Sequence, residues 1–528
     1  MKINTLNIKQ LAIYSLLLVA FIACKEEPKL QVSIGERTLI PMPISVEENI
    51  GTFEIHEETP IYVSGSEDLV DVAYYFAERM HIATDFHLPV EPSSEGNTSG
   101  ILFKISSAIK HQEGYKISVT ENLVTLEANT PEGAFRGVQT LLQLLPDEID
   151  SYGVSNVRWG IPAVVIEDAP QYNYRGTMLD VSRHFFSVDD VKRYIDLITA
   201  YKINVLHLHL TDDQGWRIEI KSWPKLTQVG GSTEVDGGEG GFYTQEEYKD
   251  IVQYAQDRYI TVIPEIDMPG HTNAALASYP ELNCNDVAPE LYTGTEVGFS
   301  SLCIDKEITY KFVDDVIKEL VAITPGPYIH IGGDESHSTA LEDYIPFINR
   351  VQDMVYKYGK TPIGWDEIRH GKLKESSIVQ FWANKENAKG AVKQGAKVLM
   401  SPSSRMYMDM KYDTLTKIGL KWAGLINVKT AYDWNPSTFV DSISKSDIVG
   451  VEAPLWAETI EDMEDIEYMV FPRLLGYAEI GWSPDSLRNW DSYKARLAKQ
   501  YKRFDYKEIN FYKSKMVPWD KGLKDTLQ

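Results

Sequence analysis

The spacing of hydrophobic residues changes near Pro170. Before it, apolar and polar residues alternate in runs such as GTFEIHEETPIYVS and GYKISVTENLVTLEA. A period of two is typical of strands with one buried face. These runs are followed by TPEGAFRGVQTLLQLL, whose apolar residues recur at helical spacing. The pattern predicts a compact α+β domain over residues 37–168.

After Pro170, short apolar runs alternate with amphipathic helical patterns. Eight runs are predicted to be strands: RGTMLDV, INVLHLHL, ITVIPEI, YIHIGG, TPIGWDE, SIVQFWA, AKVLMSP and DIVGVEAPLW. Eight strand and helix repeats indicate a closed parallel (β/α)8 barrel, a TIM barrel of the α/β class, over residues 169–505. Its last helix is expected to run unbroken through YMVFPRLLGYAEIGW. Residues 506–528 are interpreted as a C-terminal tail without an assigned function.

The N-terminus has the pattern of an export signal. Lysines precede an apolar run from Leu11 to Ala23, and Cys24 is followed by polar residues. This run is short for a membrane span and suits a signal peptide. FIAC resembles the lipobox of bacterial lipoproteins, which implies a signal peptide over residues 1–24, a lipidated Cys24 and a tether over residues 25–36. We therefore expect an exported protein with a lipid anchor in the bacterial outer membrane, facing the periplasm or the cell surface. An ordinary secretory signal with an incidental cysteine is the alternative.

Composition narrows the range of partners. The chain has 528 residues, of which 43% are hydrophobic, so it is long enough for more than one domain. Its 52 basic and 77 acidic residues give a formal charge of -25, which argues against nucleic acid or an anionic lipid surface as a partner. Cys284 and Cys303 could form a disulfide in an oxidising compartment or remain two buried thiols, and neither has the setting of a zinc ligand.

Charged and aromatic residues collect just after the predicted barrel strands. In a TIM barrel these positions meet at one end, where the catalytic groups lie. Sugar rings stack on tryptophan, and their hydroxyl groups need carboxylate and guanidinium partners, so this mixture indicates a carbohydrate site. The candidates include Asp180, Arg183, His184, His207, His209, Asp212, Asp213, Trp216, Glu265, Asp267, His271, His330, Asp334, Glu335, Trp365, Asp366, Glu367, Trp382, Tyr407, Asp409, Trp422, Trp456 and Glu458.

The pair Asp334 and Glu335, in the run HIGGDE, has an unusual arrangement for a glycosidase. Most glycosidases place two carboxylates on opposite sides of the scissile bond, at least about 5 Å apart. Neighbouring residues are poorly placed to flank a bond in this way. A nearby negative charge raises the pKa of a carboxyl group, which suits a general acid. The pair therefore predicts a division of labour in which only Glu335 contacts the leaving oxygen.

Seven motifs occur in the order found in one enzyme family. They are RGTMLDVSRHF, HLHLTDDQGWR, PEIDMPGH, HIGGDE, GWDE, YMD and APLWAE. Over roughly residues 37–505 the chain resembles glycoside hydrolase family 20, the β-N-acetylhexosaminidases. The resemblance implies an exo-acting, retaining enzyme without a cofactor that releases terminal N-acetylhexosamine from glycans. In such enzymes the 2-acetamido oxygen of the substrate is the nucleophile, and an oxazolinium ion is the intermediate.

The resemblance also implies a role for each site residue. Glu335 would be the general acid/base, Asp334 would orient the acetamido group, and Tyr407 would donate a hydrogen bond to its oxygen. Asp212 and His271 would form a relay towards Glu335. The remaining roles would be sugar binding by Arg183 at C3 and C4, acetamido pocket walls from Trp365, Trp382 and Trp456, ring stacking on Trp422, and acceptors for the C4 and C6 hydroxyls from Asp409 and Glu458.

Two other classes of protein remain open at this point. His207 and His209 form an HxH pair that could bind a divalent metal as in amidohydrolase-type barrels, together with Asp212, His271, His330 and Asp334. Those barrels usually carry HxH on the first strand and do not need a cluster of tryptophans. The other class is a surface lipoprotein that captures glycans without catalysis, which would need no acid with a tuned pKa. The choice between N-acetylglucosamine and N-acetylgalactosamine is also open.

Overall fold

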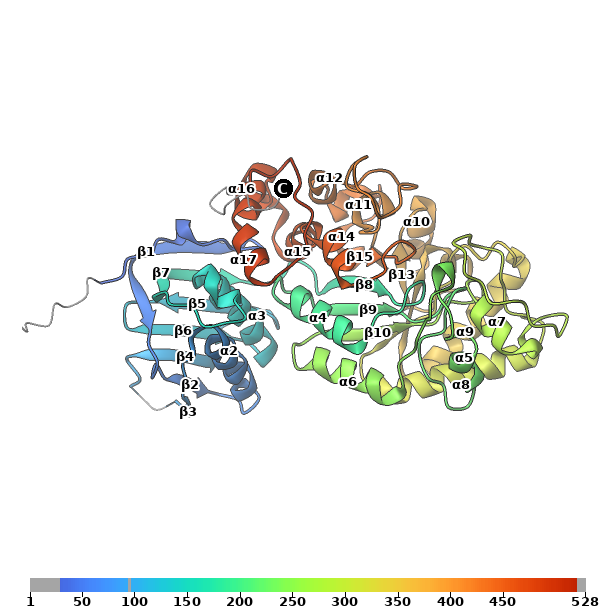
Figure 1. Ribbon diagram of the computed structural model, residues 1–528, viewed down its shortest axis with the longest axis horizontal. Coiled ribbons are helices and arrows are strands. Elements are labelled where there is room, and N and C mark those ends of the chain that lie inside the picture. The colour runs from blue at the N-terminus through green and yellow to red at the C-terminus, as the bar shows by residue number, and fades with distance from the viewer. Residues whose placement is uncertain (1–28, 94–95, 520–528) are drawn as a thin grey trace, which may run out of the picture.

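The computed structural model describes residues 29–93 and 96–519 as two domains that lie side by side (Figure 1). The predicted signal peptide and Cys24 lie outside these residues. The described part of the expected tether, residues 29–36, lies against the smaller domain, where the Val32 N–H donates to Thr52 Oγ1 at 2.9 Å. Within residues 29–93 and 96–519, no helix combines the length and the apolar character needed to cross a membrane.

The smaller domain is a seven-stranded mixed sheet in the order β1-β7-β5-β6-β4-β2-β3. Two helices, α2 (Leu69–Thr84) and α3 (Pro131–Leu144), pack against it. Thr130 caps α3 by accepting from the N–H of Gly133, and the apolar face of the helix is buried on the sheet. The predicted α+β domain is confirmed. Its strands are β1 (Ser45–Ile55), β2 (Ile61–Ser64), β3 (Val90–Pro92), β4 (Gly100–Ile105), β5 (Tyr115–Val119), β6 (Leu123–Ala128) and β7 (Trp159–Asp168).

The larger domain is a closed barrel of eight parallel strands, and each lies in one of the eight predicted runs. The (β/α)8 fold is therefore confirmed. Short apolar runs form the strands because both of their faces are buried, one in the barrel and one under the helices. The strands are β8 (Tyr174–Asp180), β9 (Val205–His209), β10 (Thr261–Glu265), β11 (Tyr328–His330), β12 (Thr361–Trp365), β13 (Ile378–Phe381), β14 (Lys397–Met400) and β15 (Ile448–Leu455).

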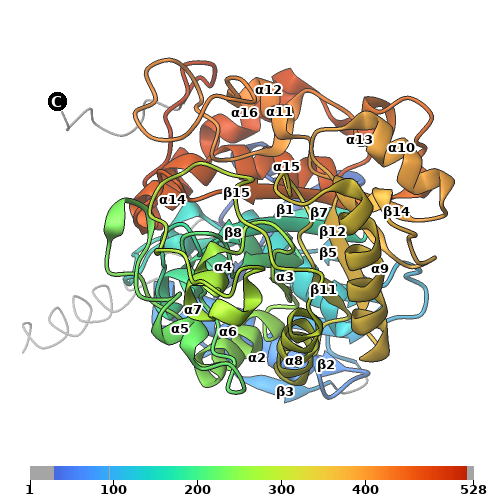
Figure 2. The ribbon, with the colours of Figure 1, turned by 90° about the vertical axis from the view of Figure 1, so that its right-hand side faces the viewer.

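Helices surround the barrel, and shorter helices lie within the segments that connect its strands (Figure 2). The four longest are α4 (Val188–Thr199), α6 (Gln245–Gln256), α8 (Glu307–Ile323) and α9 (Leu341–Lys357). Shorter helices are α5 (Lys225–Gln228), α7 (Asn273–Ser278), α10 (Lys385–Lys393), α11 (Ser403–Met406), α12 (Val428–Tyr432) and α13 (Pro436–Phe439). Single 3-10 turns are Ile34–Glu36, Asp147–Asp150, Val235–Gly237, Pro280–Leu282, Asp366–His370, Lys445–Asp447 and Asp485–Leu487.

The expected long C-terminal helix is wrong, because it is two helices. α14 (Met463–Val470) ends just before Pro472, and α15 (Arg473–Trp482) begins just after it. Proline has no backbone N–H, and its ring collides with the carbonyl of the preceding turn, so a helix breaks there. Two further helices, α16 (Trp490–Lys499) and α17 (Tyr501–Tyr506), return towards the small domain.

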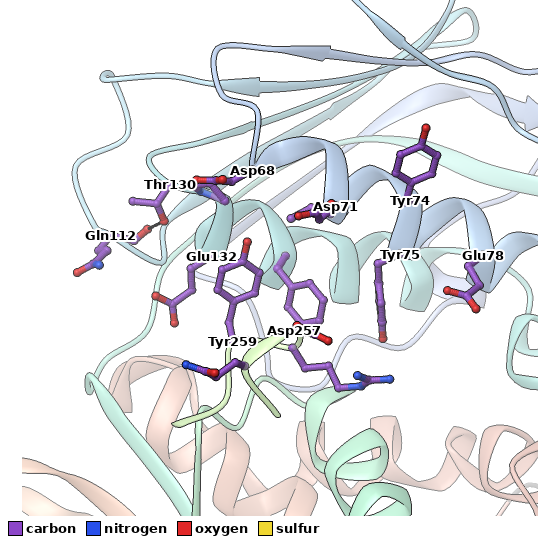
Figure 3. Close-up of a pocket in the computed structure, with 15 residues that line it drawn as sticks. Asp68, Asp71, Tyr74, Tyr75, Glu78, Gln112, Thr130, Glu132, Asp257 and Tyr259 are labelled. Atoms are coloured by element: carbon purple, nitrogen blue, oxygen red, sulfur yellow. Dashed lines mark hydrogen bonds between the residues drawn. The ribbon is translucent and has the colours of Figure 1, made fainter. Parts of the chain in front are cut away.

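The small domain packs against the N-terminal ends of the barrel strands. Arg175, at the start of β8, donates to Glu113 of the small domain at 3.0 Å, and Arg136 of α3 donates to the carbonyl of Tyr259 just before β10 at 2.6 Å. A crevice of about 860 Å³ remains beside this contact. In Figure 3, Tyr259 extends from the barrel side towards Asp68 at the start of α2. The C-terminal ends of the strands are therefore left free at the opposite side of the barrel, which faces the viewer in Figure 2.

Candidate active site

A partly open pocket of about 220 Å³ lies at the C-terminal ends of the strands. It brings together eight of the predicted site residues from five different strand ends. The pocket is lined by Arg183, Thr295, Val297, Asp334, Glu335, Trp382, Tyr407, Leu420, Trp422, Trp456 and Glu458. Charged groups and aromatic rings thus share one small cavity.

The turn after β11 positions Asp334 and Glu335. It contains two glycines because a larger residue would collide with neighbouring atoms. Gly332 has φ +63°, and a Cβ there would lie 1.7 Å from Asp267 Oδ1. Gly333 has φ +105°, and its N–H donates to the same Asp267 oxygen at 3.0 Å. Only glycine adopts these angles without strain at such close approach. The sharp turn that follows presents Asp334 and Glu335 to one cavity.

The two carboxylates have different surroundings. The Asp334 side chain is 10% exposed, whereas the Glu335 side chain is 30% exposed. Burial, and then the neighbouring Asp267, raise the pKa of Asp334 well above its usual value. Burial also raises the pKa of Asp267 to about 7. Asp334 therefore lies in surroundings that disfavour its negative charge, while Glu335 stands at the more exposed side of the pocket.

His271 lies beneath both carboxylates. Its Nε2 is 3.7 Å from Asp334 Oδ2 and 3.8 Å from Glu335 Oε2, and its Nδ1 is 3.1 Å from Asp212 Oδ1. Burial alone would lower the pKa of His271, but Asp212 and Asp334 raise it well above its usual value. The ring is thus a cation between Asp212 and the pair at the pocket. Asp212 in turn lies 2.7 Å from Arg183 Nη2.

Aromatic rings form the walls of the pocket. Trp382 and Tyr407 stack with 18° between their planes, and Trp422 meets both edge-on. Trp422 is 56% exposed, which places it at the mouth. Trp365 does not line the cavity. It is buried behind Trp456, with ring centroids 5.5 Å apart, and so supports the wall from outside the pocket.

Polar groups at and behind the pocket lack partners, and one of them, Asp409, is buried and does not line the cavity. Arg183 lies over the ring of Trp456, 4.9 Å from its centroid, and 3.2 Å from Asp180 Oδ2. Within the described residues, neither oxygen of Asp409 has a hydrogen-bond partner, nor does Glu458 Oε2. Burial and the charge of Glu458 raise the pKa of Asp409 well above its usual value. Buried acceptors without donors are rare in folded proteins and suit a ligand rich in hydroxyl groups.

Sequence reasoning assigned no role to several groups at the pocket. Thr295 and Val297 come from the loop between Cys284 and Cys303, which carries no recognisable motif. Glu367 was noted only as a residue at a strand end. Its Oε2 accepts from Trp382 Nε1 at 3.1 Å, and burial and the nearby Asp366 raise its pKa well above its usual value.

The sequence left the state of Cys284 and Cys303 open, and the structure joins them in a disulfide. The bridge closes a loop with a sequence separation of 19 residues, and closure of a loop of this size is worth about 3 kcal/mol. We expect the double variant Cys284→Ser/Cys303→Ser to unfold at a lower temperature. Its KM for an N-acetylhexosaminide should rise, because Thr295 and Val297 lose their fixed positions. Unchanged Tm and KM in the variant would contradict a structural role for the bridge.

The HxH histidines take part in a network of ion pairs. His207 Nδ1 lies 2.9 Å from Glu452 Oε1, and His209 Nε2 lies 2.9 Å from Asp212 Oδ2. Both histidines also contact Glu265. His207, Glu265 and His330 lie close enough together to hold a metal ion. The same atoms form charge-assisted hydrogen bonds with one another, which accounts for their burial.

Family models match nearly the whole described chain. The model described as "Glycosyl hydrolase family 20, catalytic domain" matches residues 172–485, and "Glycosyl hydrolase family 20, domain 2" matches residues 36–169. The chain is 39% identical to a "Beta-N-acetylhexosaminidase" of Cellulomonas fimi over 486 residues, which covers 91% of this chain and 97% of the relative. It is 37% identical to a "Beta-hexosaminidase" of Porphyromonas gingivalis, covering 94% of this chain and 67% of that protein.

Solved structures show the same two-domain architecture. A GH20 β-N-acetylhexosaminidase from Streptomyces coelicolor superposes with a TM-score of 0.90 at 47% identity, covering 93% of this chain and 100% of that one. The N-acetyl-β-hexosaminidase of Streptomyces plicatus, solved in complex with Thio-NAglucal, gives a TM-score of 0.89 at 48% identity, covering 93% of this chain and 99% of that one. A mutant of the Streptomyces plicatus enzyme was solved with GlcNAc as its product.

Proposed function

Because the chain belongs to glycosyl hydrolase family 20 and is a β-N-acetylhexosaminidase, we propose that Asp334 and Glu335 divide the catalytic work between them. The observation that carries the proposal is that both carboxylates line one pocket together with aromatic residues, with His271 in reach of each. A nucleophile supplied by the substrate removes the need for a second carboxylate across the bond. Because the chain belongs to this family, we interpret it neither as a metal-dependent amidohydrolase-type barrel nor as a protein that only captures glycans.

The first half of the reaction breaks the glycosidic bond. The acetamido oxygen of the bound sugar attacks C1 while Glu335 gives its proton to the departing oxygen. The electron pair of the C1–O bond leaves with the aglycone, and C1 gains a bond to the acetamido oxygen. Burial and then Asp334 raise the pKa of Tyr407 well above its usual value, so its phenol stays protonated and donates to that oxygen. Asp334, as a carboxylate, accepts the acetamido N–H and offsets the charge of the oxazolinium ion.

The second half restores the enzyme. Glu335, now a carboxylate, takes a proton from water as the water oxygen attacks C1, and the bond from C1 to the acetamido oxygen breaks. Two displacements at C1 leave the anomeric configuration unchanged. His271 and Asp212 act on Glu335 from below the pocket. His271 Nε2 lies 3.8 Å from Glu335 Oε2, and His271 is therefore in reach of the Glu335 side chain.

The far end of the pocket would hold the remaining hydroxyl groups. Arg183 lines the pocket and would donate to the C3 and C4 hydroxyls, and the unpartnered oxygens of Asp409 and Glu458 would accept from C4 and C6. Trp365, Trp382 and Trp456 would enclose the acetamido group, with Trp365 acting as support, and Trp422 would stack at the mouth. A pocket of about 220 Å³ suits a single terminal sugar and therefore exo action.

The Arg183→Lys variant tests sugar binding. Lysine keeps the positive charge beside Asp212 but cannot donate two parallel hydrogen bonds. We expect KM for p-nitrophenyl β-N-acetylglucosaminide to rise by about 10- to 100-fold, since a hydrogen bond to a charged group is worth about 1.5–3 kcal/mol. Michaelis–Menten kinetics beside a matched Arg350→Lys variant on the exposed face of α9 give the measurement. An unchanged KM would remove Arg183 from the sugar site.

Hydrolysis of paired substrates tests the proposed function itself. The enzyme should cleave p-nitrophenyl β-N-acetylglucosaminide and leave the corresponding β-glucoside almost untouched, because the glucoside has no acetamido nucleophile. Addition of EDTA should not change the rate. Equal cleavage of both substrates would overturn the role given to Asp334.

We also propose that the protein is exported and anchored by a lipid on Cys24 in the bacterial outer membrane. The support is the sequence pattern of lysines, apolar run and FIAC at the N-terminus. Expression in a bacterial host with labelled palmitate should give a labelled protein in the membrane fraction. A Cys24→Ser variant should lose the label and leave the membrane. A labelled variant, or an unlabelled wild type, would contradict lipidation at this cysteine.

A further inference from the structure

One buried carboxylate lies between the aromatic wall of the pocket and the relay of charged residues beneath Glu335. Glu265, the last residue of β10, is fully buried beneath the pocket, accepts hydrogen bonds from Trp365 and His209, and is in ion-pair contact with His207 and His330. Trp365 Nε1 and His330 Nδ1 each lie 2.8 Å from its Oε1. His207 Nε2 lies 3.0 Å from its Oε2, and His209 Nδ1 contacts the same oxygen. Both oxygens are thus fully occupied by groups from β9, β11 and β12.

The hydrogen bond from Trp365 connects Glu265 to the wall of the pocket. Trp365 is buried behind Trp456, which lines the cavity, and its indole N–H has Glu265 as acceptor. The position of this hydrogen bond fixes the plane of the Trp365 ring. The ring in turn limits where Trp456 can lie. A shift of Glu265 Oε1 would therefore move the wall proposed to enclose the acetamido group.

The contact with His209 connects Glu265 to the residues beneath Glu335, the proposed acid/base. His209 bridges Glu265 and Asp212, and Asp212 lies 3.1 Å from His271, which is within 4 Å of Asp334 and Glu335. Burial alone would lower the pKa of His209, but Glu265 raises it well above its usual value, so the ring is a cation that holds Asp212 in place. The relay under Glu335 therefore ends on Glu265.

We propose that Glu265 is a positioning residue that couples the wall of the acetamido pocket to the relay beneath the acid/base. This inference rests on the proposed function, since it assigns both ends of the coupling from that reaction. Glu265 contacts neither cavity nor substrate, and its effect passes through Trp365 on one side and His209 on the other. The position of the pocket wall and the position of the relay beneath Glu335 thus depend on the same carboxylate, through its hydrogen bonds with Trp365 and His209.

A matched pair of substitutions separates positioning from general stability. Glutamine at position 265 carries an amide NH₂ in place of one carboxylate oxygen and must lose the hydrogen bond from either Trp365 or His209, so Glu265→Gln should lower kcat by about tenfold and raise KM by about tenfold. Glu452→Gln is the control. Glu452 is equally buried in the barrel and accepts from His207 and Gln380, but it contacts neither Trp365 nor His209. It should lower Tm while KM and kcat change less than threefold.

A double-mutant cycle tests the coupling directly. Trp365→Phe keeps an aromatic side chain but removes the indole N–H that donates to Glu265. His209→Asn removes the imidazole that contacts Asp212. If Glu265 couples the two sides, Trp365→Phe lowers kcat as well as raising KM, and the double variant is impaired by much less than the product of the two single effects. Multiplicative effects, or an equal loss in Glu452→Gln, would overturn the inference. Lack of wild-type activity on the N-acetyl substrate would instead overturn the proposed function.

Discussion

The Glu335→Gln variant is expected to lose kcat/KM by about 10²- to 10⁴-fold on N-acetylglucosaminides with poor leaving groups, which is the usual worth of a positioned general acid. Glutamine has nearly the same shape but no proton to give to the departing oxygen. Glu335 is the more exposed of the two carboxylates and stands at the open side of the pocket, where the leaving group must pass. Steady-state kinetics on a methyl or disaccharide aglycone provide the measurement.

The leaving group supplies an internal control for this prediction. A dinitrophenyl aglycone departs without protonation, so the variant should retain far more of the first step with that substrate. Glu342→Gln, on the exposed start of α9, is the matched control and should behave as wild type. Equal losses with good and poor leaving groups would assign Glu335 a role other than proton donation.

The Asp334→Asn variant is expected to lose about 10²- to 10³-fold in kcat, the usual effect of removing one preorganised group that stabilises the transition state. An amide cannot offset the positive charge that develops on the acetamido group. Burial in the pocket would make that missing charge costly. The measurement is kcat for p-nitrophenyl β-N-acetylglucosaminide, with Asp343→Asn on α9 as a matched surface control. A kcat within threefold of wild type would contradict the role given to Asp334.

The same substitution should stabilise the fold at neutral pH. The pKa of Asp334 is raised in the folded state, so the folded protein binds this proton more tightly than the unfolded chain does. Its contribution to stability is therefore fully present below the unfolded pKa near 3.8 and is lost as pH rises towards the folded pKa. Asparagine mimics the neutral form and removes this loss. Thermal unfolding should give a higher Tm for Asp334→Asn at pH 7, and a smaller difference at pH 4.

The barrel and the candidate site differ in how far the sequence could predict them. The eight strands were predictable because parallel strands are apolar on both faces and stand out as short runs between amphipathic helices. The residues after each run then had to converge, as Arg183, Asp334 and Glu458 do in the pocket. The break at Pro472 was also encoded locally, but the apolar pattern on both sides of it suggested one helix.

Other features depended on distances that a sequence does not contain. The pairing of Cys284 with Cys303 needed their Cα atoms at 4.8 Å, which no local pattern indicates. Thr295 and Val297 reach the pocket only because that loop folds back over it. Trp365 carries the same motif signal as the other tryptophans, yet it lies behind the wall because its indole is held by Glu265. The four contacts of Glu265 come from three other strands and so are invisible along the chain.

The central claim is that the substrate's own acetamido oxygen is the nucleophile, and one series of substrates tests it most directly. Replacing the N-acetyl group of p-nitrophenyl β-N-acetylglucosaminide by mono-, di- and trifluoroacetyl withdraws electrons from that oxygen with little change in size. We predict that kcat/KM of the wild-type enzyme falls steeply and progressively with each fluorine. A rate that stays constant across the series, or that follows leaving-group chemistry alone, would mean that a group of the enzyme attacks C1 and would contradict the roles given to Asp334 and Glu335.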